Sequence, residues 1–194
     1  MKQFSVLLFT LLLTNTGVAF EKDTTFKVFE KSTTNSGFGG VTFNMFAGNH
    51  VLIGGEGAAI FGNFYLGGFG YGGSLGQYTY PFGAYAQTLT KQSGGILVGA
   101  MSNTKAIFSL YTDLKLSWDQ YVWHEDGVGT DSTSIEYSGF SFLPTIGVAI
   151  RPTNFLQLKL GYGYNFSSLT DDGGLENVPY NAGQFTFGLT FGGF

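Results

Sequence analysis

The stretch AIFSLYTDLKLSW, residues 106–118, alternates between apolar side chains and side chains that are mostly polar or charged. Leu110 and Leu114 lie on one parity, whereas Asp113 and Lys115 lie on the other. A period of two over about a dozen residues is typical of a β-strand with one apolar face. The stretch therefore predicts a sheet protein whose apolar and polar side chains point to opposite faces.

Seven further stretches extend this pattern along the chain. Three alternate clearly: FSFLPTIGVAIR at 140–151, FLQLKLGYGYNF at 155–166 and QFTFGLTF at 184–191. The less regular ones are residues 38–46, 51–60, 64–73 and 94–101. The sequence thus predicts eight strands, and an even number suits a bacterial membrane barrel.

The predicted connections alternate in length along most of the chain. The short ones are residues 47–50, 61–63, 102–105 and 151–154, and the long ones are residues 74–93, 121–139 and 167–183. In outer-membrane barrels the tight turns face the periplasm and the long loops face outside. We therefore expect both termini in the periplasm, with 47–50 as an unusually short outer connection.

The composition excludes several other classes of protein. Lys and Arg number only 9 in 194 residues, and nucleic acid binding requires clustered cations. Cysteine is absent, so the chain has neither a disulfide framework nor a lipid-attachment cysteine. The 31 glycines and 18% aromatic residues favour an all-β fold, namely a transmembrane, antiparallel, up-and-down β-barrel of about eight strands.

The N-terminus predicts export. Residues 1–19 combine a basic residue, an apolar run and small residues before a cleavage site, as a secretory signal peptide does. Residues 20–36 are a predicted periplasmic N-terminal segment, in which 24–29 could add a strand, and residues 37–194 are the predicted barrel domain. The expected localisation is the outer membrane of a Gram-negative bacterium.

A set of stretches that covers nearly the whole of residues 37–194 carries a family resemblance. They are FGGVTFNMF, GGEGAAIFGNFYLGGFGYGG, SGGILVGAMSNTKAIFSLYTDLKLSW, FLPTIGVAIRPTNFLQLKLGYGYNF, LTDDGG and FTFGLTFGGF. In this order they resemble an uncharacterised family of small outer-membrane β-barrel proteins from Bacteroidota, eight-stranded and OmpA- or OmpX-like in architecture. The resemblance implies an exported outer-membrane barrel. It supplies no catalytic residues, because the activity of the family is not established. The chain departs from the family in the sixth strand, where Thr145 and Ala149 stand in place of acidic residues facing the lumen.

The glycine-rich stretch at 54–73 contains a match to the dinucleotide-binding pattern GxGxxG, at Gly68, Gly70 and Gly73. That mechanism needs a helix N-terminus directly after the glycines. The following SLGQYTYPFGAYA has no helical period. We therefore expect wall strands here and no phosphate site.

The predicted strand at 64–73 places its glycines and its rings on opposite parities. The residues expected to face the lumen are Gly68, Gly70 and Gly72. The residues expected to face lipid are Tyr65, Phe69 and Tyr71. Glycine inside would leave room for long side chains from neighbouring strands.

Parity also places five polar side chains inside the predicted barrel. This expected lumen cluster is Glu56, Asp113, Lys115, Gln157 and Lys159. Buried charges are tolerable only when they are paired, so we expect a polar plug that closes the pore. An ion or proton pathway is less favoured, because an eight-stranded barrel has a filled interior.

Two further groups of residues have expected roles at the membrane. The expected aromatic girdle is Tyr78, Tyr80, Trp118, Tyr121 and Trp123. The expected signal for the outer-membrane assembly machinery is Phe187, Leu189, Phe191 and Phe194. Phe194 lies off the parity of the other three, so either a bulge at Gly192 and Gly193 restores its direction or it is not part of the lipid face.

The sequence predicts a non-enzymatic outer-membrane barrel, structural or an accessory subunit of an envelope complex, with its outer loops as contact surfaces. No catalytic, cofactor-binding or metal-binding residues are predicted. The expected partners are outer-membrane lipid and lipopolysaccharide, the assembly machinery and an envelope protein complex, and nucleic acid is not among them.

Two alternatives stay open. One is a small barrel enzyme acting on lipid or lipopolysaccharide, which would use His124 with an acid and a serine of the same loop, although no sequence context singles out a nucleophile. The other is a secreted, soluble β-sandwich binding module, whose strands also alternate. A sandwich would expose its polar parity to water, and here that parity is rich in glycine and poor in charge.

Overall fold

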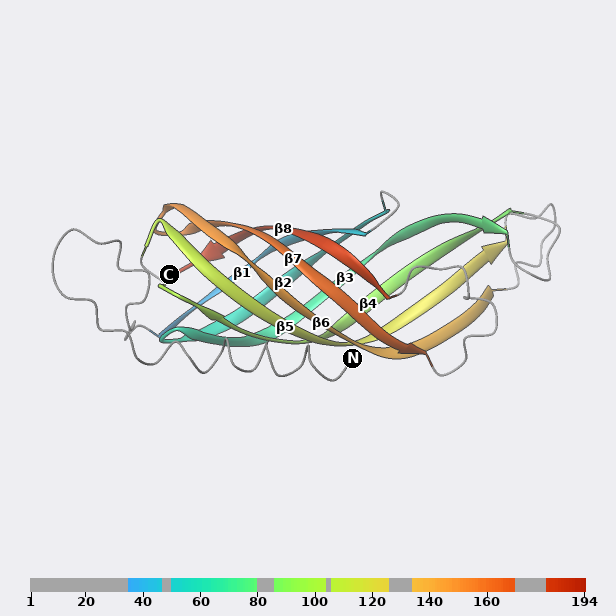
Figure 1. Cartoon of the computed structure of the whole chain (residues 1–194), viewed down its shortest axis with the longest axis horizontal. Coiled ribbons are helices and arrows are strands. Elements are labelled where there is room, and N and C mark those ends of the chain that lie inside the picture. Colours follow the sequence, from blue (N-terminus) through green and yellow to red (C-terminus); the bar gives the residue numbers. More distant parts are fainter. Residues whose placement is uncertain (1–34, 47–49, 80–85, 104–105, 126–133, 170–180) are drawn as a thin grey trace, which may run out of the picture.

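The computed structural model describes residues 35–46, 50–79, 86–103, 106–125, 134–169 and 181–194. The strands are β1 (Asn35–Phe46), β2 (His50–Phe61), β3 (Phe64–Thr79), β4 (Ala86–Met101), β5 (Phe108–Glu125), β6 (Ser134–Thr153), β7 (Leu156–Leu169) and β8 (Ala182–Gly192). Each pairs antiparallel with the next, and β1 pairs with β8, so the sheet closes into a barrel (Figure 1). The prediction of an all-β, eight-stranded, up-and-down barrel is confirmed.

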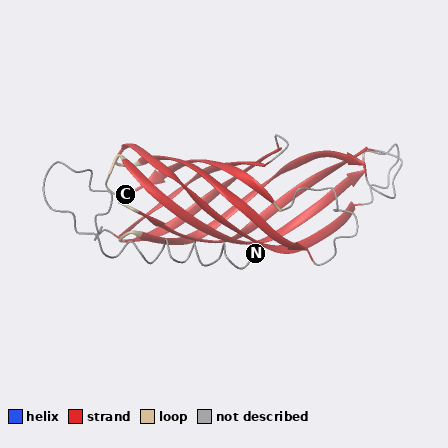
Figure 2. Cartoon of the chain, in the orientation of Figure 1, coloured by secondary structure: helices blue, strands red, loops and turns tan. Residues whose placement is uncertain are grey.

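Strands make up nearly all of the described chain, as Figure 2 shows. In that part, no helix has the length and apolar character that a membrane span requires. Strand β1 begins at Asn35, two residues before the predicted start of the barrel at residue 37. The predicted signal peptide and the possible strand at 24–29 lie outside the described residues.

The two ends of the barrel differ in their connections. At one end, the turn end, Gly62 and Asn63 join β2 to β3, and residues 154–155 join β6 to β7. The chain also leaves β8 at this end, which lies on the left in Figure 1. Gly62 has a φ of 66°, which the two-residue turn of a β-hairpin favours. The opposite end, where β1 meets β2 and β3 meets β4, is the hairpin end.

The strands on one side of the barrel are longer than the sequence predicts. Strands β3 to β6 have 16, 16, 18 and 20 residues and extend beyond the others at the hairpin end, on the right in Figure 1. The connections predicted at 74–93 and 121–139 are therefore mostly strand, and those predictions are wrong. The apolar alternation fades there because outward positions carry polar residues such as Gln92 and Gln120, while inward positions such as Leu89 stay buried.

The barrel is apolar on the outside and charged on the inside. Phe64, Ile146 and Phe185 are 68%, 64% and 63% exposed. The charged side chains buried in the interior are Glu56, Lys91, Asp113, Lys115, Asp119, Arg151 and Lys159. Charged residues are almost never fully buried in water-soluble proteins unless they are paired, so this distribution is the reverse of the usual one.

Strand β3 presents the opposite face to the one that the sequence predicts. Tyr65, Phe69 and Tyr71 are at most 8% exposed and point into the barrel, so Gly68, Gly70 and Gly72 on the opposite parity face outward. The expectation for these rings and glycines is therefore wrong. The reason is the size of the interior, which the side chains of an eight-stranded barrel must fill. Space for the rings comes from glycines on neighbouring strands, since a Cβ at Gly99 would lie 2.3 Å from the Tyr65 ring.

Candidate functional site

Four charged side chains from three strands meet inside the barrel. We call them the Glu56 cluster: Glu56 of β2, Asp113 and Lys115 of β5, and Lys159 of β7. Lys159 Nζ lies 2.9 Å from Glu56 Oε1 and 3.0 Å from Asp113 Oδ2. Lys115 Nζ lies 3.0 Å from Glu56 Oε2. Two cations thus meet two carboxylates, and no member is more than 5% exposed.

Aromatic side chains enclose the ammonium group of Lys159. Its Nζ lies 4.6 Å from the centre of the Tyr111 ring and 5.3 Å from the centre of the Tyr65 ring. The Tyr65 hydroxyl donates a short hydrogen bond to Asp113. Cation–π contacts at desolvated sites contribute about 2 kcal/mol each. The rings that fill the lumen therefore also stabilise the charges that it contains.

A second charged group, the Asp119 cluster, lies farther along β5 toward the hairpin end. Lys91 Nζ lies 2.7 Å from Asp119 Oδ2. The hydroxyls of Ser93 and Ser117 donate to Asp119 Oδ1 at 2.6 and 2.9 Å. Ser141 donates to Asp119 Oδ2 at 2.8 Å. This carboxylate thus has four partners and balances the charge of one lysine.

The sequence reasoning missed the Asp119 cluster for an identifiable reason. Lys91 lies within 74–93, for which the alternation predicts a loop, so no parity was assigned to it. Asp119 continues the parity of Asp113 and Lys115, and a strand extended beyond residue 118 would have placed it in the lumen. The signal in the sequence that could have revealed this cluster was the run of polar residues at odd-numbered positions of β5.

The expected lumen residues are all buried, but they do not form a single group. Four of them meet in the Glu56 cluster. Gln157 is fully buried and bonds elsewhere, since its Nε2 donates to Met101 Sδ at 3.3 Å and its Oε1 accepts from Thr190 Oγ1 at 3.4 Å. Gln157 therefore points into the lumen as predicted but does not contact the charged residues. The proposed pore-closing role stays a prediction.

Part of the expected aromatic girdle lies inside the barrel. Trp118 is 60% exposed and faces outward. Tyr121 and Trp123 are at most 1% exposed and point into the barrel, so their assignment to the girdle is wrong. The prediction ended the strand at residue 118, whereas β5 continues and keeps its odd residues inside. Tyr80 and the side chain of Tyr78 lie outside the described residues.

The expected assembly signal divides between the two faces of the wall. Phe187 and Phe191 are 39% and 48% exposed, and Leu189 shares their outward parity. The Phe194 ring instead stacks on Phe38 inside the turn end, with 6.0 Å between ring centres. Phe194 therefore does not belong to the outer face, which was one of the two alternatives. A role of these residues in assembly stays a prediction.

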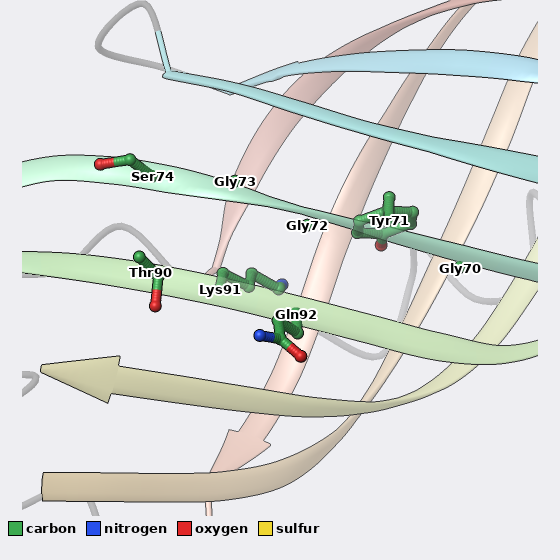
Figure 3. A pocket seen from close by; sticks show the side chains of 8 residues that line it. All are labelled: Gly70, Tyr71, Gly72, Gly73, Ser74, Thr90, Lys91 and Gln92. Carbon is green, nitrogen blue, oxygen red and sulfur yellow. The ribbon is translucent and has the colours of Figure 1, made fainter. Parts of the chain in front are cut away.

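An open hollow of about 600 Å³ lies between β3 and β4. Figure 3 shows its lining residues: Gly70, Tyr71, Gly72, Gly73, Ser74, Thr90, Lys91 and Gln92. The Ser74 hydroxyl accepts a hydrogen bond from the backbone N–H of Gly76 at 3.1 Å. The ammonium group of Lys91 is held by Asp119 inside the barrel. The hollow therefore offers polar groups but no free charge among its lining residues.

Other candidate chemistry finds little support in the described part of the chain. Within those residues, no three His, Cys, Asp or Glu side chains form a group that could hold a metal ion. His124 lies on β5, and its side chain lies outside the described residues. The GxGxxG match lies within β3, whose next described neighbour in the chain is β4. That context differs from the strand and helix of a dinucleotide site.

No protein-family model matches the sequence, and no curated protein matches it either. Among solved structures, the barrel is similar to Neisserial surface protein A. The TM-score is 0.52 at 11% identity, over 82% of this chain and 94% of that chain. A second similar structure is that of Ail, the attachment invasion locus protein of Yersinia pestis, in complex with the heparin analogue sucrose octasulfate. The TM-score is 0.49 at 11% identity, over 81% of this chain and 97% of that chain. Both are eight-stranded outer-membrane barrels. The likeness to Neisserial surface protein A shows a shared fold.

Proposed function

We propose that this protein is an integral outer-membrane β-barrel with a closed lumen that acts as a structural or accessory protein of the cell envelope. The observation that carries the proposal is the inverted distribution of polarity. Lys91, Lys115 and Lys159 are at most 1% exposed inside the barrel, whereas large apolar side chains are exposed on all eight strands. A lipid bilayer is the solvent that matches such a surface.

The outer surface argues against a water-soluble protein. Monomeric soluble proteins rarely expose contiguous apolar patches larger than a few hundred Å². Here exposed apolar residues follow one another around the barrel, for example Ile96, Leu110, Ile146 and Leu160 on β4 to β7. A closed barrel also pairs its backbone groups without leaving a sheet edge, which hydrocarbon requires. A β-sandwich of two separate sheets does not describe this fold.

The interior supports a closed lumen. The lysines of the two clusters are paired with carboxylates, and buried rings such as Tyr65 and Tyr111 occupy the space beside them. We therefore infer no aqueous channel and no enzymatic activity. The residues that remain for interaction lie on the outside of the barrel. Beyond Trp118, polar groups form the outer wall of the hairpin end. Two of them are Gln120 and Glu136, which are joined by a hydrogen bond of 3.0 Å. This wall is the proposed contact surface.

The orientation and partners follow from the same proposal. We place the turn end in the periplasm and the hairpin end outside, after export with a cleaved signal peptide and insertion by the outer-membrane assembly machinery. Outer-membrane lipid and lipopolysaccharide would surround the apolar belt, and an envelope protein complex would bind the hairpin end. The motif resemblance supports a source in Bacteroidota.

Membrane insertion is tested by extraction and by gel migration. We expect the protein to stay in membranes through carbonate and high-salt washes, and to migrate differently on gels with and without boiling. Release by carbonate or salt alone would contradict the membrane barrel. In planar bilayers the purified protein should show no steady conductance, and a stable open channel would contradict the closed lumen.

The non-enzymatic part of the proposal has a separate test. Cells that carry His124→Ala should show the same lipid and lipopolysaccharide profile as cells with the unchanged protein. A matched control is Ser138→Ala, a polar residue on the outer side of β6. A changed profile with His124→Ala alone would favour the barrel enzyme.

A further inference from the structure

The interior of the barrel contains one cation that lacks a carboxylate partner among the described residues. Its buried cations are Lys91, Lys115, Arg151 and Lys159, and its buried carboxylates are Glu56, Asp113 and Asp119. Four cations less three carboxylates leave one positive charge. The three lysines account for all the ion pairs of the described residues, so the excess charge belongs to Arg151.

Arg151 lies near the end of β6, at the turn end, and is 6% exposed. Its guanidinium carbon lies 4.8 Å from the centre of the Phe194 ring. Its Nε and Nη2 are buried and have no hydrogen-bond acceptor among the described residues. Buried N–H donors without acceptors are costly, because their lost hydration is not replaced.

Two phenyl rings separate Arg151 from the nearest acids of the lumen. The Phe194 ring covers the guanidinium and stacks on Phe38 at 6.0 Å, and Phe38 in turn lies 5.4 Å from Lys159 Nζ. The carboxylates beyond this stack are already bound by Lys159, Lys115 and Tyr65. The side-chain carboxylates of the lumen therefore do not balance the charge of Arg151, and the turn end is the open side from which a partner can reach it.

We propose that Arg151 is a binding site for a carboxylate group that enters the barrel at the turn end. The planar guanidinium presents pairs of N–H donors that match the two oxygens of a carboxylate. The Phe194 ring lies over the guanidinium carbon, and the unpaired Nε and Nη2 are the donors that remain for this contact. A singly charged carboxylate also balances the single excess charge, whereas a phosphate group, with a charge of about −1.5 to −2, exceeds it.

The carboxylate has two possible sources. The segment that precedes β1 contains Glu21, Asp23 and Glu30, and β1 begins at the same end of the barrel as Arg151. Asn35 follows Glu30 by five positions, a reach of up to roughly 17 Å. The other source is an acidic peptide or another molecule that carries a carboxylate.

The test uses the full chain in mild detergent and measures the midpoint of thermal unfolding by gel migration. The parent is a variant with Glu21→Gln, Asp23→Asn and Glu30→Gln, so that its own segment cannot supply the ligand. Replacing chloride by acetate at constant ionic strength should raise the midpoint of this parent by about 2 °C or more. Addition of Arg151→Gln should abolish the rise. No effect of acetate, or an equal effect after Arg151→Gln, would overturn the proposal.

Two further measurements complete the design. If the chain with Arg151→Gln does not fold, Arg151→Lys replaces it, and acetate should then shift the midpoint by less than half as much, because lysine lacks the planar pair of donors. An equal shift overturns the site, and so does a larger shift with inorganic phosphate than with acetate in the parent. The source follows from the protein with its acids intact: a smaller acetate response than in the parent supports its own segment, and an equal response supports another molecule.

Discussion

The inner and outer faces of the barrel wall both contain many glycines, but their surroundings differ. On the inner face, a Cβ added at Gly67 would lie 1.9 Å from the Gly57 carbonyl oxygen, and one at Gly161 would lie 2.2 Å from the Tyr111 hydroxyl. On the outer face the nearest atom is a backbone oxygen of a neighbouring strand, at 3.1 to 3.7 Å, at every glycine except Gly183, where the Tyr162 hydroxyl would lie at 2.2 Å. The outer glycines that meet only backbone oxygen at this range are Gly37, Gly39, Gly55, Gly57, Gly68, Gly70, Gly72 and Gly94.

This difference shows that glycine has two separate structural roles in the same barrel wall. Most inner glycines are required by packing, because rings or neighbouring backbone occupy the space of a side chain. Most outer glycines have only a backbone oxygen nearby, and some form rows across strands, as Gly39, Gly57 and Gly68 do by pairing in register. The inner face therefore specifies the fold, and the outer face tolerates change. Four substitutions test this contrast, from the largest expected effect to the smallest.

Lys159→Met should have the largest effect, because it removes a cation from the crowded inner face. Asp113 loses its ion pair and stays buried, and breaking a buried pair costs about 3–5 kcal/mol. The measurement is the free energy of unfolding in urea, followed by gel migration. Adding Asp113→Asn should restore part of the loss, since it removes the unpaired charge. A loss below about 1 kcal/mol would show that the lumen is open to water.

Gly67→Ala should cost about 3 kcal/mol, at the upper end of the usual range for overpacking, because the obstruction is backbone that cannot rotate away. Gly68→Ala is the matched control, one residue along on the outer face, where the nearest atom lies at 3.4 Å. Both variants are compared in the same urea titration. Equal losses would contradict the assignment of the two faces of β3.

Gly99→Ala should cost about 1–2 kcal/mol, since the obstruction is a side chain, the ring of Tyr65, that can shift. In a Tyr65→Leu background the same change should cost much less, because the ring is gone. A double-mutant cycle on unfolding free energies measures this coupling. Additive losses would mean that Tyr65 does not lie over Gly99.

Gly70→Ala should have the smallest effect, between zero and a gain of about 0.5 kcal/mol, because alanine restricts the unfolded chain and meets no obstruction. The urea midpoint should not fall. A loss above about 1 kcal/mol would show that the outer face is as crowded as the inner one.

The alternation of side chains was enough to predict the strands, their antiparallel order and the Glu56 cluster. The β5 stretch placed Asp113 and Lys115 on one face, and the same rule placed Glu56 and Lys159 with them. In β3 both parities contain apolar residues and glycine, so the alternation did not distinguish the inner from the outer face. The rings of β3 were predicted to lie on the outer face, which is wrong. Periodicity identifies two faces, but it does not state which of them is inside.

The ends of the strands show a second limit of the sequence. Outward-facing polar residues interrupt the apolar alternation in the extended parts of β4 and β5, so the sequence did not indicate that these strands continue. Lys91 and Asp119 were therefore missed as lumen residues, and Tyr121 and Trp123 were predicted to lie outside. The partners that reveal these positions are distant in the chain, since Lys91 of β4 pairs with Asp119 of the neighbouring strand β5. Such contacts leave no local pattern.

The sequence by itself determined an all-β chain with eight strands and a charged parity, because a period of two and the turn residues are local properties. Only the tertiary structure decided which parity of β3 fills the lumen, which glycines are obligatory and where the charge of Arg151 lies. These features depend on the closure of β1 against β8, which creates an interior of limited volume. The rings are inside because that volume must be filled, and Arg151 has no carboxylate partner among the described residues because the carboxylates of the lumen lie beyond the Phe194 and Phe38 rings.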